Sequence, residues 1–216
     1  MNITKFGHAC LYLEKSDHGF LIDPGNLTEE FSIPSRLQAI VLTHSHPDHL
    51  DTRKINDILA INPQANIYGH KDTLQSLKGV VYPARLLPVS AGMKLTIGDF
   101  KLEFNGGRHA EIHLDLPTLS NLGLIIDGGD FFYPGDALEV PAVKVKVLAL
   151  PASAPWMKIS ETLDYLAAVK PKTAIPVHDG ILSEAGRQII DRMLASKAKE
   201  LSINYSRIDG LKTVEL

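Results

Sequence analysis

Histidine and aspartate side chains gather in the six residues from His44 to His49, which read His-Ser-His-Pro-Asp-His. An apolar run at residues 39–42 comes just before them and predicts a β-strand that ends there. In an extended chain, residues i and i+2 point to the same side, so His44 and His46 can bind one cation together. Asp48 and His49 then remain for a second cation. Neutral imidazole and carboxylate groups suit zinc, with iron and manganese as rivals.

The alternative is a polar surface loop that happens to be rich in histidine. With the 9 histidines of this 216-residue chain, we expect the whole pattern by chance in roughly one such chain in a thousand. We therefore favour a metal site, which must draw further ligands from other parts of the sequence.

Candidate ligands occur at three further places, each just after a predicted strand. Taken singly, each has an ordinary explanation, because an aspartate after Pro-Gly is commonly a turn residue and a lone histidine commonly lies on the surface. Their order behind the first motif favours metal binding instead. They are His109 and His113 after residues 100–104, Asp136 after residues 131–133, and His178 after residues 173–177.

Short apolar runs bounded by turn residues predict many strands, and helical patterns fall in both halves of the chain. The expected strands are residues 3–6, 9–13, 20–22, 39–42, 67–69, 80–82, 94–97, 100–104, 122–126, 131–133, 143–150 and 173–177. The expected helices are residues 52–61 capped by Asp51, 72–78, 160–169 capped by Ser160, and 183–199. Two strand-rich halves that each carry helices predict sheet packed on sheet with helices outside, as a single four-layer α/β domain over residues 1–216.

Composition narrows the classes of function. The formal net charge is −3 at a pI near 6.3 without any basic block, so we expect neither a nucleic-acid nor a membrane partner. The single cysteine, Cys10, excludes an internal disulfide and a cysteine-rich zinc site. The first residues lack the apolar stretch of a signal peptide, and we expect a cytoplasmic location. The expected partner is a small-molecule substrate, and the oligomeric state stays open.

The succession of motifs resembles the metallo-β-lactamase-fold hydrolases over nearly the whole chain. That family has H-x-H-x-D-H, a downstream histidine, an aspartate after a strand and a final histidine after another strand. Residues 7–10, 21–24 and 135–137 are similar to a branch of small hydrolases that includes ascorbate-phosphate lactonase-like proteins. The resemblance implies an αββα sandwich of mixed sheets, a site at one edge of the paired sheets and a dinuclear centre. It implies zinc as the usual metal, with manganese or iron as alternatives.

The resemblance also assigns the ligands, position by position. The first ion would be held by His44, His46 and His109, the second by Asp48, His49 and His178, and Asp136 would bridge both. We favour His109 over His113 as the ligand because a Gly-rich turn precedes it at the end of a strand. His113 would then lie beside the ligands or face the substrate. His8 belongs to the opening motif of the branch and is a candidate to approach the site.

Zinc lowers the pKa of bound water from about 15.7 to about 7, so a metal-bound hydroxide would be available near neutral pH. We expect it to attack a small ester, lactone or phosphodiester. The candidate catalytic residues are Asp48, together with His113 and His8, which could stabilise an oxyanion or protonate the leaving group. The loop at residues 151–157 holds the only tryptophan, Trp156, which could form a pocket wall or cap the core.

Two other classes of function stay open. An iron-dependent redox enzyme of the same fold would use a similar ligand set, although an intact His49 and the lack of a fused flavin domain speak against it. A non-catalytic, metal-stabilised binding protein would not need every candidate ligand that this chain retains.

Overall fold

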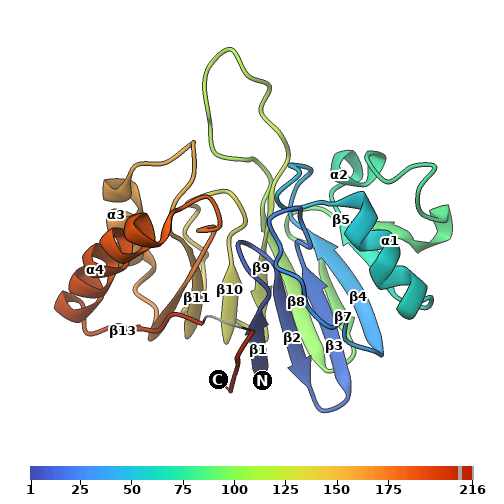
Figure 1. The fold of residues 1–216 in the computed structure, drawn as a ribbon, viewed down its shortest axis with the longest axis horizontal. Coiled ribbons are helices and arrows are strands. Elements are labelled where there is room, and N and C mark those ends of the chain that lie inside the picture. Colours follow the sequence, from blue (N-terminus) through green and yellow to red (C-terminus); the bar gives the residue numbers. More distant parts are fainter. Residues whose placement is uncertain (209–210, 216) are drawn as a thin grey trace.

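Residues 1–208 and 211–215, which the computed structural model describes, form two seven-stranded β-sheets that pack face to face (Figure 1). The first sheet contains β1 (Asn2–Lys5), β2 (Leu11–Lys15), β3 (His18–Ile22), β4 (Leu37–Leu42), β5 (Asn66–Gly69), β6 (Leu86–Pro88) and β14 (Thr213–Glu215). The second contains β7 (Lys94–Ile97), β8 (Phe100–Gly106), β9 (Leu122–Ile126), β10 (Phe131–Tyr133), β11 (Val147–Pro151), β12 (Thr173–Val177) and β13 (Asn204–Tyr205). Their spatial orders are β14-β1-β2-β3-β4-β5-β6 and β13-β12-β11-β10-β9-β8-β7.

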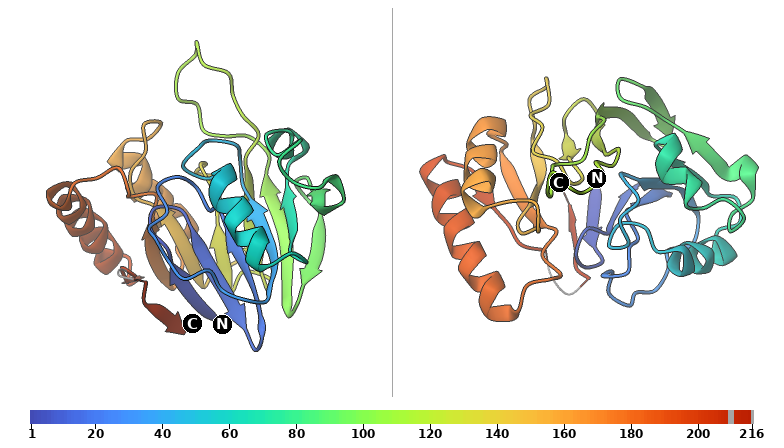
Figure 2. Two further views of the ribbon diagram at one scale, coloured as in Figure 1. Left: turned by 45° about the vertical axis from the view of Figure 1, so that its right-hand side comes forward. Right: turned by 90° about the horizontal axis from the view of Figure 1, so that it is seen from above.

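Helices cover the outer face of each sheet (Figure 2). α1 (Thr52–Ile61) and α2 (Lys71–Gln75) pack on the first sheet, and α3 (Ile159–Val169) and α4 (Glu184–Glu200) pack on the second. Both sheets mix parallel and antiparallel pairs. The predicted four-layer αββα sandwich is therefore confirmed. Within the described residues, no helix combines the length and apolar character needed to cross a membrane.

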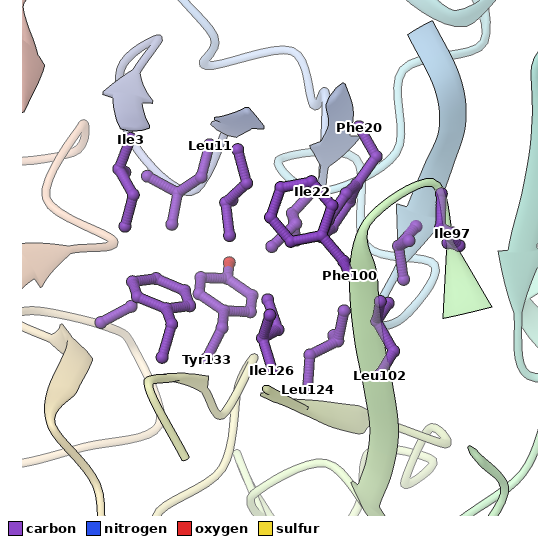
Figure 3. Packing of buried hydrophobic residues seen from close by; sticks show 14 of the residues in the cluster. Ile3, Leu11, Phe20, Ile22, Ile97, Phe100, Leu102, Leu124, Ile126 and Tyr133 are labelled. Carbon is purple, nitrogen blue, oxygen red and sulfur yellow. The ribbon is translucent and has the colours of Figure 1, made fainter. Parts of the chain in front are cut away.

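The main core lies between the two sheets. Ile3, Leu11 and Ile22 of the first sheet face Leu124 and Tyr133 of the second, and all five side chains are buried (Figure 3). Two smaller clusters fill the space between each sheet and its helices. Because strands that are buried on both faces read as nearly continuous apolar runs, β4, β9 and β11 were recognisable in the sequence.

Helix caps explain where two of the helices begin. Asp51 accepts hydrogen bonds from the backbone N–H groups of Arg53 and Lys54, which starts α1 at the predicted residue. Ser183 accepts one from Gly186 and starts α4. The predicted cap Ser160 is wrong. α3 begins at Ile159, where the carboxylate of Glu161 accepts from the Lys158 N–H at 2.6 Å.

Some predicted strands differ from the structure. Residues 80–82 form only an isolated bridge, because Val81 pairs with Lys78 and Pro83 then opens a short 3₁₀ helix, Pro83–Arg85. Residues 143–146 are not part of a strand, although Val143 and Val145 pack in the cluster between the second sheet and its helices, and β11 starts at Val147. The edge strands β6, β13 and β14 are only two or three residues long, too short to show an alternating pattern.

Strand direction decides where the functional loops emerge. β1 and β3 both pair antiparallel with β2, and β3 runs parallel to β4. In the second sheet, β8 and β10 both pair antiparallel with β9, while β10, β11 and β12 run parallel. In the first sheet, the carboxyl ends of β1, β3 and β4 therefore lie along one edge. In the second sheet, those of β8, β10, β11 and β12 do the same, and the loops that follow these strands leave from that edge.

Candidate metal centre

The seven predicted ligands meet at this edge of the sandwich. Together with His8 they form two groups, and within each group the facing nitrogen and oxygen atoms all lie within 4.8 Å of one another. The first group is His44, His46, His109 and Asp136, and the second is His8, Asp48, His49 and His178. Each member follows one of the strands β1, β4, β8, β10 and β12.

Asp136 lies between the two groups. Its Oδ1 is 3.1 Å from Nε2 of His49, and its Oδ2 is 3.1 Å from Nε2 of His178 and 3.4 Å from Nε2 of His109. One carboxylate therefore faces histidines of both groups. This is the position that a ligand shared by two ions requires.

Hydrogen bonds fix the ring tautomers of three of these histidines. Nδ1 of His49 lies 2.7 Å from Oδ2 of Asp23, Nδ1 of His109 lies 2.6 Å from the Ala110 carbonyl, and Nδ1 of His178 lies 2.7 Å from the Ser153 carbonyl. Because these oxygens only accept, each Nδ1 carries the proton and donates it. Each Nε2 therefore faces the centre, where its lone pair is available to a cation.

These lone pairs are buried without hydrogen-bond partners. Nε2 of His49, His109 and His178 and Oδ1 of Asp136 are all buried polar atoms that no described group satisfies. A nitrogen lone pair facing a carboxylate oxygen is unfavourable unless a cation lies between them. The residues therefore fit divalent metal ions, and the chemistry of the donor set fits zinc.

The distance between the imidazole nitrogens of His44 and His46 also fits a shared metal ion. Thr43 Oγ1 donates to Asp23 at 2.7 Å, so its oxygen is left to accept from Nδ1 of His44 at 3.0 Å. Nε2 of His44 then faces Nδ1 of His46 at 3.1 Å. Two nitrogens on one tetrahedral zinc ion are about 3.3 Å apart when each Zn–N bond is about 2.0–2.1 Å. The observed separation suits shared coordination.

Asp23 is a functional residue that sequence reasoning did not assign. It is fully buried, and its carboxylate accepts from His49 Nδ1, from the hydroxyl of Tyr133 at 3.0 Å, and from both the backbone N–H and the hydroxyl of Thr43. It thus orients His49 directly and His44 through Thr43. Carboxylate–histidine pairs of this kind hold ligands in place and raise their basicity. The available signal was an aspartate at the end of a buried strand, before proline.

A tight turn places Asp136. Asn121 Oδ1 accepts from the Asp136 backbone N–H at 3.0 Å, and Asn121 Nδ2 donates to the Pro134 carbonyl at 2.9 Å. Gly135 lies between them with a φ of 63°, and a Cβ there would come within 2.3 Å of Asn121 Oδ1. Only glycine suits this position.

Trp156 forms a wall of the centre. Its indole N–H donates to Asp136 Oδ2 at 2.7 Å, and its ring centroid lies 6.1 Å from that of His109 and 6.4 Å from that of His178. Of the two roles considered from the sequence, the structure supports the pocket wall.

This contact makes Trp156 a reporter of metal binding, because it is the only tryptophan of the chain. A cation bound by Asp136 withdraws charge from the oxygen that accepts the indole N–H. We therefore expect zinc added to chelator-treated protein to change the tryptophan emission in a saturable way, measured by fluorescence titration. The Asp136→Ala variant should lose the response. Emission that stays constant while zinc binds would contradict this contact.

His113 lies outside the cluster. Residues 107–120 form a long exposed loop without helix or strand, which rises above the sheets at the top of Figure 1. His113 is 65% exposed, and its Nδ1 accepts from the Asp115 backbone N–H at 3.2 Å. The prediction that it lies beside the ligands is corrected, because the extended loop carries it away from the histidine four residues earlier. That it faces the substrate, as a candidate catalytic residue, stays a prediction.

The two histidines of this loop should therefore respond differently to substitution. His109→Ala removes a buried imidazole that faces Asp136, and we expect one metal position to lose occupancy. His113→Ala should keep both ions, because its side chain contacts only its own loop. Elemental analysis of the two variants in parallel checks this, and metal loss on substitution of His113 would reverse the assignment.

Charge interactions keep both carboxylates ionised. Burial disfavours charge on Asp136 and Asp48, but the neighbouring imidazoles outweigh it and hold the pKa of each carboxyl below its usual range. Burial also disfavours the charged form of His178, yet the nearby carboxylates of Asp136 and Asp48 raise its pKa to about 9. The centre therefore favours positive charge, which a divalent ion can supply.

Two adjoining groups of histidine and aspartate, at one edge of an αββα sandwich, define a metal-binding protein of this fold. The model of the beta-lactamase superfamily domain, Lactamase_B_3, matches residues 2–178. The chain belongs to this family, the metallo-β-lactamase superfamily.

Known proteins resemble the chain over most of its length. Protein Rv0786c of Mycobacterium tuberculosis is 39% identical over 193 residues, which cover 88% of this chain and 89% of that protein. The UPF0173 metal-dependent hydrolase of Carboxydothermus hydrogenoformans is 27% identical over 199 residues, covering 82% and 84%. The metallo-beta-lactamase fold protein YhfI of Bacillus subtilis superposes with a TM-score of 0.72 at 16% identity, covering 99% and 98%. This last likeness is one of fold.

Proposed function

We propose that this protein is a hydrolase that holds two divalent ions, with zinc as the best fit, and cleaves a small ester, lactone or phosphodiester. The observation that carries the proposal is the set of buried imidazole nitrogens without hydrogen-bond partners that face the carboxylate of Asp136 from both groups. The hydrolase name of the Carboxydothermus relative supports the class of reaction.

The proposed ligands divide by position. His44, His46 and His109 would hold one ion, Asp48, His49 and His178 the other, and Asp136 would contact both. Bound divalent ions lower the pKa of water and polarise a carbonyl or phosphoryl oxygen.

Exposure indicates the direction from which a substrate approaches. Asp48 is 26% exposed and His46 is half-buried, whereas His44, His49, His109 and His178 are buried. The open side of the centre is therefore the side of Asp48 and His46. A carboxylate at this mouth can accept a proton during hydrolysis, which keeps Asp48 as our candidate catalytic residue.

Lactones are included because of the opening motif. The segments at residues 7–10 and 135–137 are similar to those of ascorbate-phosphate lactonase-like proteins, and both lie at the centre through His8 and Asp136. We propose a small molecule as the partner, since neither the sequence pattern nor the net charge of −3 favours nucleic acid.

Metal analysis combined with a substrate screen tests the proposal. We expect up to two zinc or manganese ions per chain by elemental analysis after reloading. Turnover of a generic ester, lactone or bis-aryl phosphodiester should be abolished by chelator and restored by metal. Protein that binds no metal would contradict the proposal. Two tightly held ions without turnover of any class would favour the non-catalytic alternative, and a bound iron with a visible absorption band would favour the redox alternative.

A further inference from the structure

His8 occupies an enclosed position within the second group, beside the three candidate ligands Asp48, His49 and His178. It follows β1, only 2% of it is exposed, and its ring centroid lies 4.1 Å from that of His178. Its backbone φ is 39°, an uncommon value for a residue with a side chain, and its carbonyl accepts from the His178 N–H at 2.9 Å. The fold therefore holds this residue in a costly conformation at a place where it can act on the centre.

Proximity alone allows two roles for His8. Its Nε2 lies within the second group together with Asp48, His49 and His178, so it could be a fourth ligand. It also lies 3.1 Å from Asp48 Oδ2, so it could donate a hydrogen bond to that carboxylate. The two roles require opposite tautomers, because a ligand needs a lone pair on Nε2 and a donor needs a proton there.

The backbone of Gly180 decides between them. Its N–H donates to Nδ1 of His8 at 3.0 Å, so the lone pair of Nδ1 is occupied and Nδ1 carries no proton. A doubly protonated ring is excluded for the same reason. The ring proton must therefore be on Nε2, where it points at Asp48 Oδ2. This tautomer is the reverse of that in His49, His109 and His178, whose Nδ1 atoms donate.

The approach of Gly180 also depends on its lack of a side chain. A Cβ at this position would lie 3.0 Å from Cβ of His8 and 3.1 Å from its Nδ1. These distances are tighter than ordinary contacts, so a side chain would press the two backbones apart. Glycine lets the N–H reach the imidazole, as a specific pairing of the two residues requires.

We propose that His8 is a positioning residue that donates from Nε2 to Asp48 and is not a metal ligand. The proposal rests on the proposed function, since it assigns the role of His8 in the same centre. Asp48 is the most exposed carboxylate of the centre, and its neighbours within the group are the imidazoles of His49 and His178. The hydrogen bond from His8 holds one of its oxygens, so the carboxylate keeps a single orientation toward the second ion.

The ring tautomer can be read directly by long-range ¹H–¹⁵N NMR on protein labelled at histidine nitrogen. For His8 we expect a proton on Nε2 and none on Nδ1, whereas for His49, His109 and His178 we expect a proton on Nδ1. The His8→Gln variant identifies the His8 signals by their loss. An Nδ1–H form at His8, with a metal-shifted Nε2, would overturn the proposal. The same measurement on metal-free protein remains decisive if the proposed hydrolase activity fails.

Substitutions separate positioning from coordination. His8→Ala should retain both zinc ions by elemental analysis and lower kcat by about tenfold to a hundredfold, the usual effect of losing a partner that orients a metal ligand. In His8→Gln, the side-chain amide can donate to Asp48 from nearly the same place, so we expect most of the rate to return. His18→Gln, at a histidine that is 41% exposed and bonded to Asp99, is the matched control.

Zinc content and the rate of the His8→Gln variant distinguish the possible outcomes. Loss of one zinc ion from both His8 variants would make His8 a ligand and overturn the proposal. Equal loss of rate in both variants, without recovery by glutamine, would show that the ring serves only to pack and would also overturn it. Full metal content with recovery by glutamine supports it.

Discussion

Replacing Asp136 with alanine is expected to empty one metal position and to lower hydrolysis by at least about a hundredfold, the upper end of the effect of losing an orienting partner. Among the residues that the structure describes, Asp136 is the one carboxylate that lies within 3.4 Å of histidines of both groups. Its removal therefore takes a negative group from both positions at once and leaves two ions to repel each other. Elemental analysis and turnover with chelator-treated, reloaded protein measure both effects.

A graded series sharpens this test. Asp136→Asn keeps an oxygen that can accept from the indole of Trp156, so the tryptophan emission of the metal-free protein should not change. Because the substitution removes the negative charge, we expect the affinity for metal to fall. Asp130→Ala, at an exposed carboxylate paired with Lys146, is the control and should change neither. Normal metal content and rate in Asp136→Ala would show that Asp136 is only a turn residue.

Replacing Asp179 with alanine is expected to destabilise the fold by about 3–5 kcal/mol, the usual cost of breaking a buried ion pair from one side. Asp179 and Lys5 are each 4% exposed and 2.7 Å apart, and Arg207 also pairs with this carboxylate. Burial disfavours charge on Asp179, but the two cations outweigh it and lower its pKa. Urea denaturation followed by circular dichroism gives the change in unfolding free energy.

Glu200→Ala provides the comparison, because it removes an exposed partner of Lys197 on α4. Exposed pairs of this kind contribute less than about 1 kcal/mol. If Asp179→Ala cost no more than Glu200→Ala, the buried pair would not stabilise the fold. We also expect weaker zinc binding in Asp179→Ala, since the residue lies between His178 and Gly180 in the chain.

Local sequence patterns predicted the parts of this molecule that depend on neighbouring residues. The first motif needs only the alternation of an extended chain to bring His44 and His46 together, and the preference for His109 used the Gly-rich turn before it. Helix α1 has a cap and a proline stop within a dozen residues. The longer buried strands are recognisable because nearly all of their residues are apolar.

Features set by distant parts of the chain were not predictable in this way. The role of His8 depends on a backbone N–H 172 residues away, and that of Asp23 on a histidine 26 residues away. Trp156 reaches Asp136 only because β10 and β11 are parallel neighbours. The edge strands β6, β13 and β14 are too short to carry a pattern, and tertiary pairing alone makes them strands.

The place of β1 has a consequence for biosynthesis. This strand leads to His8 and pairs with β14, where Ile3 lies opposite Val214. Its Lys5 also forms an ion pair with Asp179, which pairs with Arg207 as well. A ribosome that has released the first motif has therefore not yet released the residues that complete the second metal position. Pairings this far apart form late, because a long loop must close first. If the proposed centre holds two ions, we expect a nascent chain to bind metal through His44 and His46 early, and to complete the centre only after nearly all of the chain has emerged.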